Sequence, residues 1–185
     1  MGGTDEIWEL LDVAFRGLEV RRQWDVCKDS RDALRVNRPR LYYCPKPDYA
    51  VGPFNTDEDR IHEVRQEIGE TYTRFEPTIQ RILSGDQWLN DFVLNDNPRC
   101  FLAIEVEDKN STKHRMGSIL NACALGKVGI VIGANESTYR SLMRIREYLR
   151  LVEEFGKARL SPKNVAILTC ERFRSALSPA RPAGF

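Results

Sequence analysis

The chain has 185 residues and a mass of 21.3 kDa, which is the size of one ordinary domain. Hydrophobic residues make up 42% and charged residues 30%, a globular composition that excludes a disordered chain and a fibrous repeat. Lys and Arg number 28 against 27 Asp and Glu, and this net charge of +1 excludes a simple polycation that coats nucleic acid by charge alone.

The first half of the chain predicts two helices around a group of short strands. Apolar residues at helical spacing follow a plausible N-cap at Thr4 and continue to Leu18. Residues 38–54 favour short strands that are interrupted by prolines. A polar turn then opens a helix over about 58–83, and Pro77 should kink or divide this helix.

The second half of the chain alternates strands and helices. The predicted elements are a strand at 100–107, a helix at 113–125, a buried central strand at 128–132, a helix at 137–157, a strand at 165–170 and a loose tail over about 176–185. Residues from 139 onward carry ten Lys and Arg against four Asp and Glu, so the basic charge gathers in the C-terminal part. With no repeat and no linker, residues 1–185 predict a single α/β domain.

The location is inferred from what the sequence lacks. No apolar run approaches the roughly 20 residues that span a bilayer, and no secretory signal is visible. Five cysteines are present, an odd number without a CxxC spacing, and we interpret them as reduced thiols. These features predict a cytoplasmic protein without a membrane partner.

The strand at 100–107 carries the most informative charges. In an extended strand Phe101, Ala103, Glu105, Glu107 and, if the strand continues, Lys109 share one face. Charges so close to a core are costly unless they are paired or bound to a metal ion. This face is therefore the first half of a candidate metal site.

A hard divalent cation needs a second acid, and Asp48 is the preferred candidate. Asp48 follows Pro47, opens a short strand, and is accompanied on its face by the small residues Ala50 and Gly52, which leave room for a ligand. Asp91 in NDFVL stays open as the alternative, because it lies only 16 positions before Glu107 whereas Asp48 lies 59 positions before it.

These residues resemble a known family. PD at 47–48, EDK at 107–109, the helix HRMGSILNACALG and the strand VGIVI are similar to the PD-(D/E)xK nuclease superfamily, over roughly residues 1–135. Segments such as PDYAVGPF also resemble uncharacterised restriction-type proteins. The resemblance implies a restriction-endonuclease-like core, with a mixed central sheet flanked by helices. It also requires a helical insertion, at about 55–90, before the ExK strand.

The resemblance also implies a chemistry. Asp48 and Glu107, with the backbone carbonyl of Asp108, would hold Mg²⁺, for which Mn²⁺ can substitute. Lys109 would orient the attacking water and stabilise the developing anion, and Lys113 is the reserve candidate for this role. An acid on the first helix would assist, and Glu9 is preferred over Glu6.

Further basic residues are candidates for contacting nucleic acid. They are Lys113, His114 and Arg115 at the start of the crossover helix, and Arg140 and Arg144 on the long helix that follows. The alternative for each set is a solvated helix face. Small residues beside them, including Gly117 and Ser118, are interpreted as helix–sheet packing positions rather than ligand-binding ones.

The sequence thus predicts a Mg²⁺-dependent nuclease that hydrolyses phosphodiester bonds, with DNA as the favoured substrate, RNA as the open alternative, and a restriction, defence or repair role. The alternative is a catalytically inactive member of the fold that serves as a nucleic-acid-binding or assembly subunit. A third hypothesis is an α/β interaction domain in which Lys109 and Arg115 pair the acids internally. Cutting two strands is simplest with two symmetry-related sites, which favours a homodimer.

Overall fold

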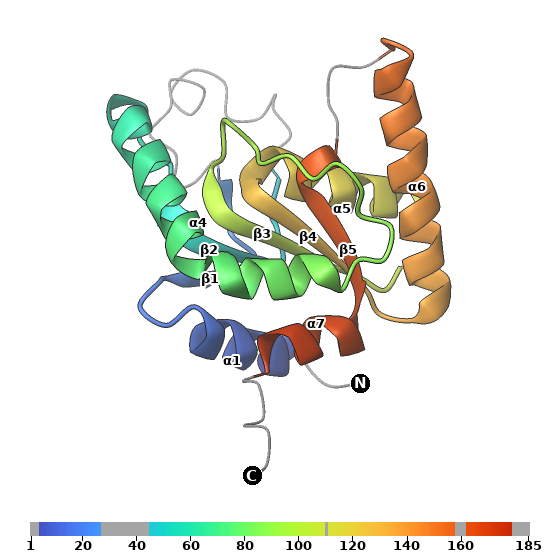
Figure 1. The fold of residues 1–185 in the computed structure, drawn as a ribbon, viewed down its shortest axis with the longest axis horizontal. Coiled ribbons are helices and arrows are strands. Elements are labelled where there is room, and N and C mark those ends of the chain that lie inside the picture. The colour runs from blue at the N-terminus through green and yellow to red at the C-terminus, as the bar shows by residue number, and fades with distance from the viewer. Residues whose placement is uncertain (1–3, 27–44, 110, 158–161, 179–185) are drawn as a thin grey trace.

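The computed structural model describes residues 4–26, 45–109, 111–157 and 162–178. The protein is an α/β domain with one five-stranded mixed sheet between helices (Figure 1). The elements in chain order are α1 (Thr4–Ala14), β1 (Val20–Arg22), β2 (Tyr49–Phe54), η1 (Glu58–Arg60), α4 (Ile61–Ser84), β3 (Cys100–Glu107), α5 (Thr112–Leu125), β4 (Gly126–Gly133), α6 (Glu136–Glu154), η2 (Pro162–Asn164), β5 (Val165–Thr169) and α7 (Cys170–Leu177).

The strand order in the sheet is the order in the chain, β1-β2-β3-β4-β5. Strands β1, β2 and β3 pair antiparallel, whereas β3, β4 and β5 pair parallel through the crossover helices α5 and α6. Tyr49 at the start of β2 lies opposite Ile104 in β3. The residues just before β2 therefore meet the carboxyl end of β3 at one edge of the sheet.

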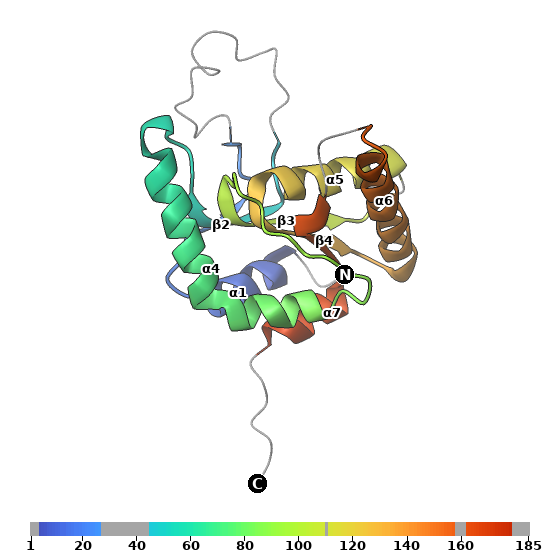
Figure 2. The same cartoon turned by 45° about the horizontal axis from the view of Figure 1, so that its top comes forward.

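Helices cover both faces of the sheet. Helices α1, α4 and α7 lie on one face and α5 and α6 on the other (Figures 1 and 2). The first face has a large apolar cluster that includes Leu11, Ile68 and Phe173, while the second includes Ile119 and Leu142. The charged end of β3 lies on the α5 side, because Ser118 and Asn121 of α5 bond to its glutamates.

The helix predicted over 58–83 is present as α4, and it continues through Pro77 rather than being divided there. Figures 1 and 2 show that α4 changes direction along its length. An internal proline removes one backbone donor and crowds the preceding turn, so a bend is the expected response.

Three elements differ from the sequence-based expectation. The first helix ends at Ala14 rather than near Leu18, and β1 was not predicted. Residues 170–177 form α7, whereas the sequence predicted the end of a strand at 170 and a tail from about 176. The helix begins there because Thr169 caps it by accepting the Arg172 N–H. The remaining tail, 179–185, lies outside the described residues, as do Tyr42, Tyr43, Cys27 and Cys44.

The alternation of side chains along β3 fails at Phe101. Phe101 was expected on the face of Ala103 and Glu105, but it packs with Phe15 and Phe75, at ring distances of 5.8 Å and 6.1 Å, in the cluster of Leu102 and Ile104. The register between β2 and β3 shifts nearby, between Val51 and Phe54, and such an irregularity re-aims side chains. The charged half of the face is unaffected.

The tight junction between helix α5 and strand β4 depends on a glycine. A Cβ at Gly126 would lie 2.3 Å from the Val128 carbonyl oxygen and 2.9 Å from the Ala103 nitrogen, so no larger residue fits. The chain therefore passes from α5 directly into β4, and α5 is held close against β3 and the site described below. No described helix combines the length and apolar composition needed to cross a bilayer.

Candidate functional site

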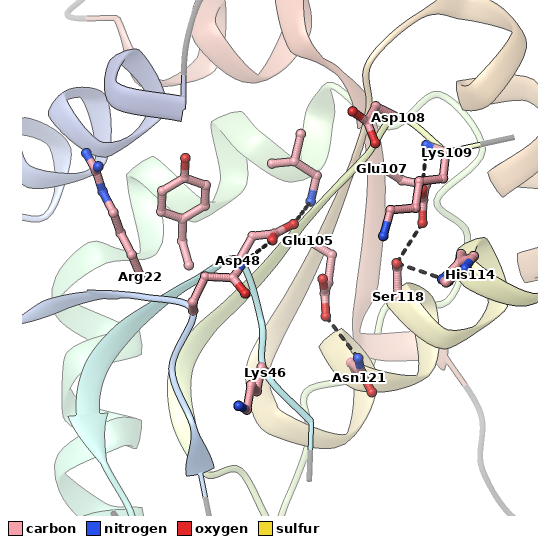
Figure 3. A pocket seen from close by; sticks show the side chains of 13 residues that line it. Arg22, Lys46, Asp48, Glu105, Glu107, Asp108, Lys109, His114, Ser118 and Asn121 are labelled. Atoms are coloured by element: carbon pink, nitrogen blue, oxygen red, sulfur yellow. Dashed lines mark hydrogen bonds between the residues drawn. The ribbon is translucent and has the colours of Figure 1, made fainter. Parts of the chain in front are cut away.

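A cavity of about 620 Å³ opens where the start of β2 meets the end of β3 (Figure 3). Its lining comes from three directions: the end of β1 and the segment before β2, the last residues of β3, and α5. The lining residues are Arg22, Gln23, Lys46, Asp48, Tyr49, Glu105, Val106, Glu107, Asp108, Lys109, His114, Ser118 and Asn121. The cavity thus combines four carboxylates with several cationic side chains.

Asp48 is fixed in the cavity by neighbours on both sides. Its Oδ2 accepts a hydrogen bond from the Val106 backbone N–H at 2.8 Å, and its Oδ1 accepts a short one from the Gln23 side-chain amide. Burial raises the pKa of the Asp48 carboxyl, the two hydrogen bonds lower it, and the nearby charges of Glu107 and Asp108 raise it again; the net shift is upward. Asp48 therefore lies in a field of like charge.

Glu107 is the last residue of β3 and is only 4% exposed. One carboxylate oxygen accepts the Lys109 backbone N–H at 2.8 Å, and the other accepts the Ser118 hydroxyl at 3.0 Å. Within the described residues, no ion pair closes off Glu107. The carboxylate is thus oriented by neutral donors at the wall of the cavity.

Glu105 lies two residues earlier on the same face and is 7% exposed. Its carboxylate accepts the Asn121 side-chain amide at 3.1 Å and the Asp48 backbone N–H. Burial, followed by the charge of Asp48, raises the pKa of Glu105 to about 8. Glu105 is therefore largely protonated at neutral pH in the protein without a bound cation.

This pKa predicts how stability depends on pH. In the unfolded chain Glu105 ionises near 4.5, whereas in the folded protein it keeps its proton up to about pH 8. The folded state therefore binds the extra proton between these values, and stability falls as the pH rises through this window. The wild type should lose free energy of unfolding between pH 5 and pH 9. We expect this loss to be smaller by about 2–4 kcal/mol in Glu105→Gln.

Denaturant unfolding in a chelating buffer, which excludes divalent cations, measures this effect. Glu105→Gln is neutral at every pH, so its stability should be flatter across the window than that of the wild type. Parallel pH profiles for the two proteins would show that Glu105 is already ionised at neutral pH.

The structure brings some of the predicted site residues together and leaves others apart. Asp48, Glu107, Asp108, Lys109 and His114 all line the cavity, with Asp108, Lys109 and His114 exposed at its rim. The other candidates do not line it. Glu9 and Lys113 are exposed on α1 and α5, and Arg115 is buried and donates to Thr138 at 3.5 Å. Arg140 pairs with Glu136 at 2.8 Å, and Arg144 lies one turn further along α6. Glu6, the rival of Glu9, pairs with Arg174 at 2.7 Å.

The structure also separates the two candidates for the upstream acid. Asp91 is exposed, has a positive φ of 54°, and its carboxylate lies 3.5 Å from Arg150 of α6. It does not line the cavity, whereas Asp48 does. The longer spacing in sequence is thus accommodated by α4 and the segment that follows it.

Sequence reasoning missed several lining residues. Ser118 was interpreted as a packing position, but it donates to Glu107, and Asn121 donates to Glu105. A signal was present: His114, Ser118 and Asn121 are spaced i, i+4, i+7 and form one polar stripe along the helix. Gln23, Arg22 and Lys46 had no comparable signal, because their place depends on how β1 pairs with β2.

Comparison of the chain with protein-family models, with curated proteins and with solved structures finds no match. The residues of the site and the topology that brings them together therefore carry the functional inference.

Proposed function

We propose that this protein is a Mg²⁺-dependent nuclease that hydrolyses phosphodiester bonds, with DNA as its substrate. The observation that carries the proposal is the cavity in which Asp48 and Glu107 meet, although they are 59 positions apart in the sequence. Lys109 lies at the rim of the same cavity, so two acids and an amine converge on one volume from neighbouring strands.

The topology supports the proposal. Three antiparallel strands lead through a crossover helix to a parallel fourth strand, which is the element order implied by the resemblance to the restriction-endonuclease-like fold. The acid of the PD pair precedes the second strand, and the EDK run begins at Glu107, the last residue of the third. Helix α4 occupies the position of the expected insertion.

The residues fit a cation that keeps much of its water shell. Within the described part of the chain, no three His, Cys, Asp or Glu side chains are grouped as a ready metal site. Mg²⁺ is commonly held by one or two carboxylates, with waters and substrate oxygens as its other ligands. Asp48 and Glu107 would hold it, and its charge would offset the burial and the like charges that together raise the pKa of Asp48.

When bound, Mg²⁺ would polarise the phosphate and lower the pKa of a bound water. The chain's own residues have distinct tasks. Ser118 and the Lys109 N–H orient Glu107, while Val106 and Gln23 orient Asp48. The Lys109 ammonium, exposed at the rim, would orient the attacking water and stabilise the anion that develops on the phosphate.

A binding protein without turnover is the second candidate. The observation in its favour is that each oxygen of Asp48 and Glu107 already accepts a hydrogen bond, so the site is satisfied without a cation. Such a protein would use the same cavity but would not hydrolyse its ligand. Metal binding and cleavage, measured separately, distinguish the two candidates.

The test uses the purified protein with single- and double-stranded DNA and RNA. With Mg²⁺ or Mn²⁺ we expect cleavage of DNA, and none in a chelating buffer. Mn²⁺ at a hundred times its Kd should stabilise the fold by about 2.7 kcal/mol. Stabilisation without cleavage of any substrate would favour the binding protein, and no response to Mn²⁺ would contradict both the metal site and the nuclease.

A further inference from the structure

Gln23, which lies beside Asp48, has an unusual backbone conformation and makes an unusual pair of contacts. Gln23 directly follows β1, and Asp48 directly precedes β2, so the two residues continue the β1–β2 ladder in which Arg22 lies opposite Tyr49. The backbone N–H of Gln23 donates to the Asp48 carbonyl oxygen at 2.9 Å, and its side-chain amide donates to Asp48 Oδ1. Gln23 thus bonds to both the backbone and the carboxylate of one residue.

The backbone at Gln23 is in the left-handed region, with a φ of 46°. Glutamine rarely adopts this conformation, which costs a residue with a Cβ free energy that glycine does not lose. A strained residue that persists beside a cluster of acids is typical of functional sites.

Two different elements each hold one oxygen of the Asp48 carboxylate. The Val106 N–H, from β3, holds Oδ2 at 2.8 Å, and Gln23, from the end of β1, holds Oδ1. With both oxygens fixed, the carboxylate keeps one orientation despite the charges of Glu107 and Asp108 in the same cavity. The backbone donor belongs to the sheet itself, so Gln23 is the part of this arrangement that a substitution can remove.

We propose that Gln23 is the positioning residue for Asp48, and that its left-handed backbone is retained because it aims the amide at the carboxylate. This inference rests on the proposed function, in which Asp48 holds the cation. Partners that orient a metal ligand typically contribute 10- to 100-fold to metal affinity or activity. Removal of the amide should therefore weaken cation binding without loss of the fold.

The substitution Gln23→Gly separates the two effects, because glycine removes the amide and relieves the backbone at once. We expect the metal-free melting temperature to hold or rise, while the Kd for Mn²⁺, measured by calorimetry, rises about 10-fold or more. If Gln23 only stabilised the pairing of β1 with β2, its replacement would lower the melting temperature and leave the Kd unaltered.

Asp91→Gly is the matched control. Asp91 has nearly the same backbone conformation, with a φ of 54°, but lies outside the cavity. Its replacement should leave the Kd for Mn²⁺ as in the wild type.

The outcomes distinguish this inference from the proposed function. Wild-type Mn²⁺ binding that persists unchanged in Gln23→Gly would overturn the positioning role and leave the metal site intact. A wild type that binds no Mn²⁺ would overturn the metal site itself. A large fall in the metal-free melting temperature of Gln23→Gly would also contradict the inference, since it would assign Gln23 to folding.

Discussion

Glu107→Gln should lower the rate of DNA cleavage by about 10³-fold or more, with little change in the melting temperature. The substitution keeps the shape of the side chain and an oxygen that can accept from Ser118 or the Lys109 N–H, but it removes the charge. A bound cation supplies several kcal/mol of transition-state stabilisation, and each 1.4 kcal/mol is a tenfold change in rate.

Asp48→Asn should have an effect of the same order, because the two acids share one cavity. The double variant should then be little worse than either single one, since residues that act as a unit are not additive. Asp91→Asn is the control, as Asp91 pairs with Arg150 at the surface and does not line the cavity. Wild-type cleavage by Glu107→Gln, or loss of cleavage in Asp91→Asn, would assign the chemistry to another site.

Asp86→Asn should destabilise the fold by about 3–5 kcal/mol, the effect usual when one partner of a buried ion pair is removed. The side chains of Asp86 and Arg146 are 0% and 2% exposed, and a short hydrogen bond and a second of 3.3 Å join them. Asp86 also accepts the Ile167 N–H at 2.7 Å, while Arg146 donates to the carbonyl oxygens of Val165 and Trp88.

This pair ties the segment after α4 to β5 and α6, so its loss affects three elements at once. In Asp86→Asn the buried guanidinium keeps only the partly exposed carboxylate of Glu147, at 3.8 Å, and denaturant unfolding should record the cost of the lost pair. The double variant Asp86→Leu with Arg146→Met should recover most of the stability, because no charge is then left buried. Glu63→Ala, which breaks the exposed pair with Arg60, is the control and should leave the unfolding midpoint within experimental scatter. An equally small effect for Asp86→Asn would contradict the assigned role.

The sequence predicted the elements whose signal is local. The continuous apolar run of β4 and the helical spacing of α4 and α6 were recognisable, as was the alternation that brings Glu105 and Glu107 to one face. Helix α7 was missed because its start depends on a cap at Thr169, which follows directly on a buried strand and leaves no separating turn.

Only some of the site residues could be predicted from the sequence, for a physical reason. Asp48 and Glu107 could be proposed because each stands at a strand end next to a recognisable pattern. Gln23, Lys46 and Arg22 reach the cavity through the pairing of β1 with β2, a long-range contact that three residues of strand do not predict. The pairing of Asp86 with Arg146 is equally non-local.

If Asp48 and Glu107 jointly hold a divalent cation, a crystal soaked in Mn²⁺ should locate that cation between them. We expect one anomalous peak between the two carboxylates, at about 2.0–2.2 Å from an oxygen of each, and no such peak in Glu107→Gln. Two results would contradict this metal site. One is a cavity without a peak, and the other is a peak on other residues while Asp48 and Glu107 remain bonded only to Gln23, Val106, Lys109 and Ser118.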